Sequence, residues 1–364
     1  MTKQPAASVK SSSEIAMYAP HSRLRLIQNR SFSTSELRRE TEPKREAGAI
    51  ALPSRMVVPK RLDGVTAQPF LHRCLTRLQN SQKSLLVLEF FETEFIDSCG
   101  IGALKILGKV ARENNVRLVA WSVRPQIANA LRATGCDHNI LIDLRMQALQ
   151  DEDSVDGQLP IAHASVSSVF KRIVDVVGGA IGLALTAVLF VPIAIAIKLD
   201  SPGPVLFSQT RLGYLGQPIR IWKFRSMVTD AEARKHEIEN EIEGAFFKNK
   251  QDPRITRVGR FLRRTSLDEF PQFWCVLIGS MSLVGTRPPT LDEVEQYEVS
   301  DWRRLNVKAG LTGQWQVSGR SAIASFNEVV ALDRAYQHQW SLLHDFNLIK
   351  QTVATVFSRR AGAV

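Results

Sequence analysis

Two adjacent carboxylates, Asp268 and Glu269, follow the most basic stretch of the sequence. They lie in RRTSLDEFPQF (Arg263–Phe273), between the apolar residues Leu267 and Phe270. An adjacent Asp and Glu can divide two tasks, because one carboxylate can attack an electrophile while the other holds a metal ion. The apolar neighbours lower the local dielectric and strengthen both interactions. The stretch therefore predicts a catalytic acid pair.

The same residues also have a purely structural interpretation. Ser266-x-x-Glu269 has the spacing of a helix capping box, in which the serine accepts from the N3 amide and the glutamate reaches back. Asp268 would then complement the helix dipole, and Pro271 would mark the first turn. The two interpretations are compatible, since a helix N-terminus also suits phosphate.

Three short segments place cations beside aromatic, glycine or proline residues: KFRSM (Lys223–Met227), GTRPP (Gly285–Pro289) and GRS (Gly319–Ser321). Each cation alone is equally typical of a surface ion pair. Together they can clamp a diphosphate, because the planar fork of arginine matches phosphate oxygens. The candidate clamp is Lys223, Arg225, Arg287 and Arg320. No histidine or cysteine pattern indicates a metal site, so any metal would be held by carboxylates and phosphates, which favours Mg²⁺.

The bulk composition narrows the classes of partner. The chain has 364 residues, a net charge of +11 and a pI near 9.7, which favours a polyanion such as an anionic membrane or a phosphorylated substrate. Nucleic acid is disfavoured, because the sequence carries no signature of a nucleic-acid-binding fold. Four cysteines without a C-x-x-C pair exclude a zinc ribbon or a disulfide scaffold and suit a reducing cytoplasm.

One apolar segment must position this chemistry at a membrane. Between Asp175 and Lys198 lie 22 residues without a charge, longer than the 18 or so that indicate a membrane helix. Cations on both sides give no inside–outside asymmetry, and Pro192 tends to bend a helix. We therefore expect a hairpin that enters and leaves on one face. A single membrane span and a soluble core helix remain alternatives.

The rest of the chain divides around this segment. Residues 1–55 are predicted to be a disordered tail, without a cleavable secretory signal, and 150–167 a polar linker. Between them, apolar runs at 84–90, 116–123 and 140–144 alternate with helical periodicity, which predicts an α/β domain with a mostly parallel sheet. A short helix is expected to begin at Pro125 and to end at Gly135.

Residues 201–364 have the content of a second globular domain. KNKQDPRITRVGRFLRR (Lys248–Arg264) carries seven basic residues against one acid. Its arginines at 257, 260 and 264 share one helical face, while apolar residues share another. This helix can lie on anionic headgroups or on a soluble core; the apolar segment nearby favours the membrane.

From about residue 168 to the end, the chain resembles the bacterial sugar transferases, the monotopic phosphoglycosyl transferases that start polysaccharide and glycan assembly. The resemblance rests on many ordered blocks: KRIVD, the apolar run, KFRSM, DPRITRVGRFLRRTSLDEFPQ, GSMSLVGTRP, VKAGLTGQWQVSGR and FNEVVALDRAYQHQWSLLHDFNLIKQTV. It implies an α+β catalytic domain (201–364) on the cytoplasmic face of the bacterial inner membrane. It also implies a re-entrant helix (168–200), with Lys171, Arg172 and Pro192 in the anchor.

The resemblance further implies a two-step, Mg²⁺-dependent reaction. Asp268 would attack the β-phosphate of a UDP-sugar and expel UMP, and polyprenyl (undecaprenyl) phosphate would then take the phosphosugar from the aspartate. Glu269 would help to hold the metal. The cations at the matching motif positions would bind phosphates: Lys223, Arg225, Arg263, Arg287 and Arg320. The product would initiate exopolysaccharide or glycan assembly.

Residues 56–149 resemble a STAS domain, the small α/β module of anti-sigma-factor antagonists and sulfate transporters. FIDSCGIGAL (Phe95–Leu104) stands where that family carries a D-S-[ST]-G loop before a helix, and some members are phosphorylated there. Ser98 keeps one hydroxyl and Cys99 replaces the other. We expect Asp97 or Ser98 to cap the following helix, and the domain to dock an unidentified protein partner or a small ligand; Ser98 is a possible phosphosite.

The sequence leaves a second class of function open. In it the transferase half is catalytically inactive, and the protein is a membrane-tethered STAS regulatory module. The retained acid pair and cations favour the enzyme.

Overall fold

The computed structural model describes residues 54–79, 84–142, 159–238, 240, 249, 251–318 and 325–357. The described residues belong to one compact unit, Ala51–Val364. The predicted tail (apart from residues 54 and 55), residues 150–158 of the predicted linker and Arg320 lie outside the described residues.

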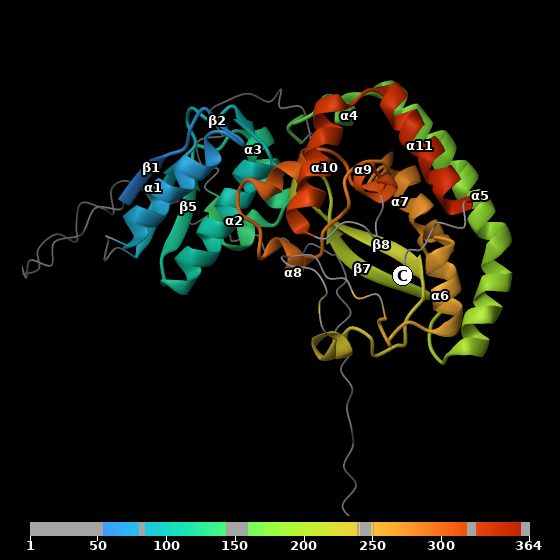
Figure 1. The fold of residues 1–364 in the computed structure, drawn as a ribbon. Helices are drawn as coiled ribbons and strands as arrows, with labels where there is room; N and C mark the ends of the chain where they lie inside the picture. Colours follow the sequence, from blue (N-terminus) through green and yellow to red (C-terminus); the bar gives the residue numbers. More distant parts are fainter. Residues whose placement is uncertain are drawn as a thin grey trace, which may run out of the picture. The chain divides into compact units, whose positions relative to one another are not determined.

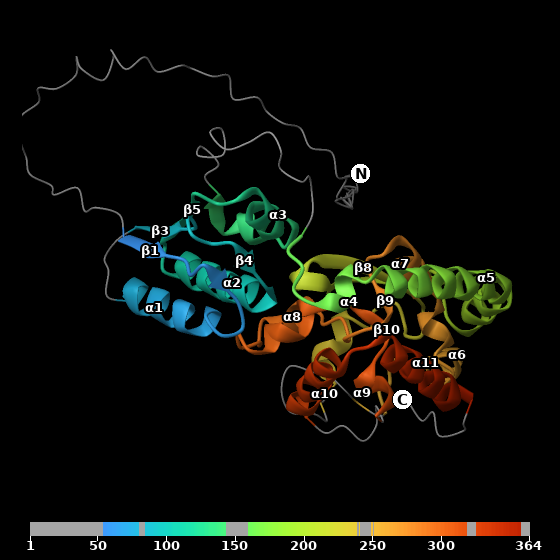
Figure 2. The ribbon, with the colours of Figure 1, turned by 90° about the horizontal axis from the view of Figure 1, so that it is seen from above.

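The N-terminal part contains a four-stranded parallel sheet in the order β1-β3-β5-β6. Its elements are β1 (Ser54–Val57), β2 (Arg61–Leu62), α1 (Ala67–Gln79), β3 (Leu85–Glu89), β4 (Phe95–Ile96), α2 (Ser98–Glu113), β5 (Arg117–Trp121), α3 (Pro125–Ala133), η2 (Cys136–His138) and β6 (Ile140–Ile142). Helices α1 and α2 lie side by side (Figures 1 and 2). The three predicted strands and the parallel sheet are confirmed.

Local signals set the helix ends in this part. The Asp97 carboxylate accepts from the Gly100 amide at 3.0 Å and caps α2, as predicted. Helix α3 begins at Pro125, whose fixed φ suits the first helical turn. Gly135 follows with φ of 73°, a conformation that glycine adopts without steric cost, so the predicted end is also confirmed.

The C-terminal part mixes short strands with helices. Its elements are α4 (Ala164–Ser167), α5 (Val169–Asp200), β7 (Leu206–Leu212), η4 (Tyr214–Gly216), β8 (Pro218–Phe224), η5 (Ala233–Glu237), α6 (Arg257–Arg264), η6 (Leu267–Gln272), α7 (Phe273–Ile278), β9 (Ser282–Val284), α8 (Leu291–Val294), η7 (Asp301–Asn306), β10 (Gly310–Thr312), α9 (Gln314–Val317), α10 (Phe326–Gln339) and α11 (Leu342–Phe357). Strands β7 and β8 form an antiparallel hairpin, and β9 pairs with β10 in parallel.

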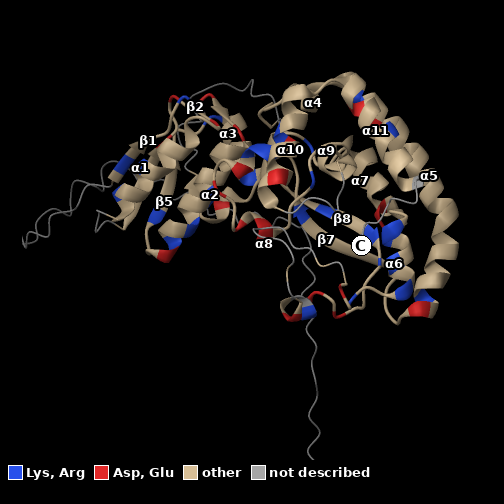
Figure 3. Cartoon of the chain, viewed as in Figure 1, with Lys and Arg blue, Asp and Glu red and all other residues tan. Residues whose placement is uncertain are grey.

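Helix α5 is one uninterrupted helix of 32 residues. Among the residues that the structure describes, it is the helix that is long and apolar enough to cross a membrane. Figure 3 shows that most of its length is free of charged residues. Pro192 removes one backbone donor but does not end the helix, so a break at this residue is not observed.

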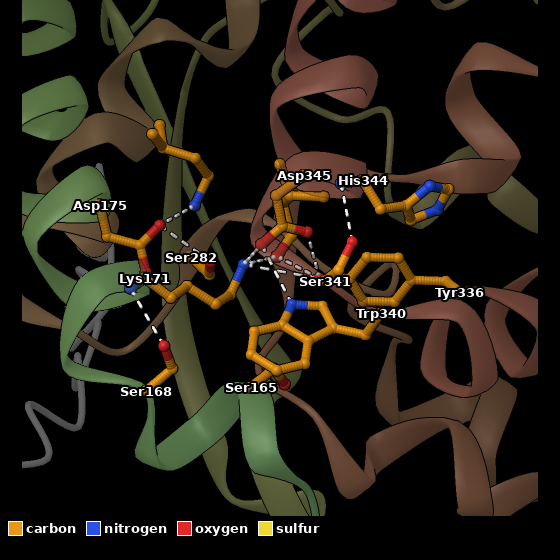
Figure 4. A network of polar contacts seen from close by, with 12 residues as sticks. Ser165, Ser168, Lys171, Asp175, Ser282, Tyr336, Trp340, Ser341, His344 and Asp345 are labelled. Atoms are coloured by element: carbon orange, nitrogen blue, oxygen red, sulfur yellow. Dashed lines mark hydrogen bonds and ion pairs between the residues drawn. The ribbon is translucent and has the colours of Figure 1, made fainter.

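The N-terminal end of α5 is held by ion pairs and hydrogen bonds (Figure 4). The Lys171 ammonium contacts the Asp345 carboxylate at 2.6 Å and the Val284 carbonyl at 2.9 Å, and both charged side chains are about 6% exposed. One turn later, Asp175 accepts from the Ser282 hydroxyl at 2.9 Å. The charges at this end are therefore satisfied within the protein.

The remainder of α5 also packs on the C-terminal part. A Cβ added at Gly182 would lie 2.3 Å from the Phe273 ring, so only glycine allows this close approach. The Thr186 hydroxyl donates to the Gly182 carbonyl at 2.7 Å and also contacts the Phe270 carbonyl at 3.3 Å, and Asp200 accepts from the Val258 amide at 2.9 Å. The helix thus contacts the same body at its start, middle and end.

Candidate active site

The acid pair lies on η6, a short 3-10 helix that follows α6. Ser266 has φ of 56° and makes no side-chain cap bond, so the predicted capping box is wrong at this position. The reason is local: the left-handed backbone of Ser266 redirects the chain, and the turn is closed by the Glu269 amide donating to the Ser266 carbonyl at 3.2 Å. The Glu269 carboxylate contacts the Lys223 ammonium instead, at 3.1 Å. The Glu269 side chain therefore faces a cation at this turn and does not cap the helix.

Cations from two elements surround this turn. Asp268 is 6% exposed, and Lys223 approaches Glu269 from the end of β8. Arg263, in the last turn of α6, donates to the Ser226 hydroxyl at 3.0 Å. Burial lowers the pKa of the Arg263 guanidinium, and the nearby Asp268 carboxylate opposes that shift. The Asp268 carboxylate therefore lies close to a buried cation.

Arg287 is fixed by a bidentate ion pair. Its guanidinium contacts both carboxylate oxygens of Glu293, at 2.8 and 2.9 Å, and its side chain is 14% exposed. Glu293 also closes a capping box with Thr290 at the start of α8. Because both guanidinium nitrogens are bonded to Glu293, the Arg287 side chain is held in one orientation.

Arg211 belongs to the same group of charges, although the sequence analysis did not include it among the candidate site residues. Burial, together with the neighbouring Arg287, lowers its pKa to about 10, against the opposing effect of Glu293 and Glu269. The β7–β8 register pairs Arg211 with Ile219 and Phe207 with Lys223, so Arg211 and Lys223 share one face of the hairpin. Strand alternation would have identified Arg211 if the hairpin had been predicted.

The other predicted residues lie elsewhere. Arg225 is buried at the C-terminal end of α5, where its guanidinium donates to the carbonyls of Pro202 and Ser201, the latter at 2.7 Å. Its predicted contact with phosphate stays a prediction. Lys171 and Arg172 hold the other end of α5, and Ser98 lies at the start of α2.

The donor set at η6 fits a magnesium ion that also binds phosphate. Asp268 and Glu269 supply hard oxygen ligands, and Mg²⁺ commonly takes one or two carboxylates together with substrate phosphates. In the described part of the chain, no group of three histidine, cysteine or acidic side chains forms a complete metal cage. Substrate oxygens would have to complete the coordination.

Comparison with known proteins identifies the class. The bacterial sugar transferase family matches residues 166–359, and the STAS domain family matches residues 56–149. The chain therefore belongs to the bacterial sugar transferase family and carries an N-terminal STAS domain. Both resemblances read from the sequence are confirmed.

Individual relatives cover the transferase part. The galactosyl transferase CpsE of Streptococcus agalactiae is 46% identical over 52% of this chain, and the UDP-glucose:undecaprenyl-phosphate glucose-1-phosphate transferase of Escherichia coli is 40% identical over 55%. The matched region spans 42% of the length of each of these two relatives. The exopolysaccharide production protein ExoY of Rhizobium meliloti is 35% identical over 54% of this chain and 89% of its own length.

Proposed function

We propose that this protein transfers a sugar-1-phosphate from a UDP-sugar to polyprenyl (undecaprenyl) phosphate and releases UMP. The observation that carries the proposal is the position of the acid pair. Thr186, in the middle of the apolar helix, contacts the carbonyl of Phe270, two residues after Asp268. The candidate phosphate site and the apolar helix therefore meet at one turn. An acceptor that is a phosphate attached to a lipid requires this arrangement. The names of the relatives support the same reaction class.

Asp268 is assigned the covalent step. A carboxylate oxygen attacks the β-phosphorus of the UDP-sugar, a new P–O bond forms, and the bond to the α-phosphate oxygen breaks, so that UMP leaves. A phosphate oxygen of the polyprenyl phosphate then attacks the same phosphorus and displaces the Asp268 carboxylate. The product is a polyprenyl diphosphate sugar, and it would initiate exopolysaccharide or glycan assembly.

The surrounding cations receive supporting roles. Lys223 and Arg263 flank the acid pair, and Arg287 is presented as a rigid fork, so the three can neutralise a diphosphate that would otherwise repel an anionic nucleophile. A bound Mg²⁺, held by Asp268 and Glu269, would add further charge neutralisation.

Release of UMP tests the reaction. Detergent-solubilised protein is incubated with Mg²⁺, polyprenyl phosphate and a panel of UDP-sugars. We expect UMP from at least one sugar, and Asp268→Asn should reduce the rate at least 1,000-fold, about 4 kcal/mol of transition-state stabilisation. The matched control Asp230→Asn changes an exposed acid of the same domain and should keep full activity. Formation of UDP in place of UMP would contradict the mechanism.

The covalent intermediate has its own test. Without the lipid acceptor, the protein incubated with the active UDP-sugar should gain the mass of one phosphosugar, and Asp268→Asn should not. Turnover by a wild-type protein that never gains this mass, even after rapid quenching, would favour direct transfer between the two substrates.

We further propose that α5 anchors the protein at the bacterial inner membrane as one continuous helix, with both of its ends on the cytoplasmic face. A spanning helix must leave the domain on one side of the bilayer, whereas α5 contacts the same body through Lys171, Thr186 and Asp200. Its opposite face exposes large apolar side chains, among them Ile181, Val188 and Leu199. Such a helix can lie in the interface with one face in the lipid.

Cysteine labelling distinguishes the two topologies. Cys74, Cys99, Cys136 and Cys275 are buried, so a membrane-impermeant thiol reagent should give little background. Phe170→Cys and Leu199→Cys introduce thiols at the two ends of α5, where the native side chains are 70% and 84% exposed. Both should be labelled from the same side as a Val65→Cys control in the STAS domain. Labelling of the two ends from opposite sides would mean that the helix spans the membrane.

A further inference from the structure

The start of α2 in the STAS domain is bonded to the transferase part. Ser98 is fully buried; its amide and hydroxyl donate to the Asn306 side-chain oxygen at 2.9 and 2.7 Å, and its hydroxyl also contacts the Trp302 carbonyl. The Asn306 amide group in turn donates to Asp97 at 3.1 Å. The segment that carries the possible phosphosite is therefore covered by η7 of the same chain.

Trp302 is the apolar centre of this contact. A Cβ added at Gly102 of α2 would lie 2.3 Å from its indole, and one added at Gly216 of η4 would lie 2.7 Å away. Trp302 is 2% exposed, and the Lys105 ammonium of α2 lies 5.6 Å from its ring centroid. Elements from both parts thus enclose one side chain, and the core of the STAS domain continues into η7.

The same short helix, η7, also contacts Arg287 of the candidate site, through Arg304. Arg304 is 1% exposed and is paired with Asp333 at 2.5 Å. Its guanidinium also donates to the Tyr297 hydroxyl at 2.8 Å and to the backbone carbonyl of Arg287 at 3.3 Å. Six consecutive residues therefore contact the STAS domain through Trp302 and Asn306 and contact the backbone of Arg287 through Arg304.

We propose that the STAS domain positions Arg287 through η7, with Trp302 and Asn306 as positioning residues. This inference rests on the proposed function, in which Arg287 binds the diphosphate of the UDP-sugar. When α2 is docked, η7 is held in place, and its Arg304 keeps the contact with the Arg287 carbonyl that fixes the Arg287 backbone. When α2 is displaced, Arg304 loses that support and the guanidinium fork is no longer held for the donor. The partner of this STAS surface is the transferase domain of its own chain.

Ser98→Asp is the first test. A carboxylate at this position faces two acceptors, the Asn306 side-chain oxygen and the Trp302 carbonyl, and should repel both. We expect the KM for the UDP-sugar to rise about tenfold with kcat changed less than about twofold, because a ground-state contact is lost. Hydrogen exchange of the 301–306 amides should increase in parallel. Ser98→Ala keeps the hydrogen bond from the amide of residue 98 to Asn306 and should behave almost as wild type. Ser84→Asp is the control at an exposed position.

Gly102→Ala tests the same contact without a charge. In a free helix alanine is more favourable than glycine by about 1 kcal/mol, so the substitution does not weaken α2 itself and acts on its contact with Trp302. The same rise in KM is expected in the full-length protein. An unchanged KM in both variants, a fall in KM or a rise in kcat, or an equal effect of Ser84→Asp would overturn the proposal. Failure of the wild type to release UMP from any UDP-sugar would instead contradict the proposed function.

Discussion

Removal of the Lys171 ammonium should destabilise the protein more than removal of any surface charge. Lys171→Met leaves the Asp345 side chain buried, at 6% exposure, without its cation, and its remaining donors are the Tyr336 hydroxyl at 2.9 Å and the Trp340 indole at 3.2 Å. Breaking a buried ion pair by removal of one partner costs about 3–5 kcal/mol. For the compact unit Ala51–Val364, that loss lowers Tm by roughly 5–8 °C.

Thermal unfolding in detergent measures the effect, and two variants sharpen it. Lys198→Met removes an exposed cation from the other end of α5 and should change stability by less than about 0.5 kcal/mol. Adding Asp345→Asn to Lys171→Met removes the unpaired charge but keeps an acceptor for Trp340, so the double variant should recover at least about 1 kcal/mol. Equal Tm values for the two lysine variants would refute the conclusion that this end of α5 is anchored in protein.

Three further predictions concern charge and packing in the transferase part. Burial raises the pKa of Asp333 to about 6, only partly offset by Arg304. The folded state therefore binds this proton more tightly than the unfolded one, and stability falls by about 3 kcal/mol as pH rises from about 4 through 6. Asp333→Asn lacks this slope, so its deficit in Tm relative to wild type should shrink between pH 4.5 and 7. Gly259→Ala places a Cβ 2.0 Å from the Ser226 carbonyl oxygen. It should lower the free energy of unfolding by about 1–3 kcal/mol and reduce UMP release. A change at the exposed neighbour Arg260 should not affect folding. Replacing the exposed arginines of α6 by glutamine should weaken binding to anionic liposomes by about 1 kcal/mol per residue, and the difference should vanish in 1 M salt; the residues are Arg257, Arg260 and Arg264.

The sequence predicted the STAS domain well because its signals are local and agree with one another. The run at 84–90 is apolar and of strand length, and β3 occupies Leu85–Glu89. Asp97 and Pro125 stand at helix starts where their chemistry is favourable, and the structure uses both. Strand β1 and helix α1 were not predicted, because their apolar residues are few and interrupted by charges.

The sequence predicted the residues of the site better than their partners. The acid pair and Lys223 come together as expected, but the capping box at Ser266 fails because a left-handed residue precedes the turn. Nothing in KFRSM indicates that Lys223 faces η6 whereas Arg225 binds carbonyls at the end of α5. Such contacts join residues far apart in the chain, and composition or periodicity does not specify them.

Polar contacts give the apolar helix its register. Hydrophobic contact is non-directional, so apolar packing alone would allow α5 to slide or rotate on the domain. Lys171, Asp175, Thr186 and Asp200 each make a hydrogen bond or ion pair to a defined group of the C-terminal part. A slide of one residue would break several of these contacts at once and leave buried charges unpaired, which is costly. The same contacts that hold the helix therefore keep Thr186 beside η6, and with it the proposed lipid surface next to Asp268.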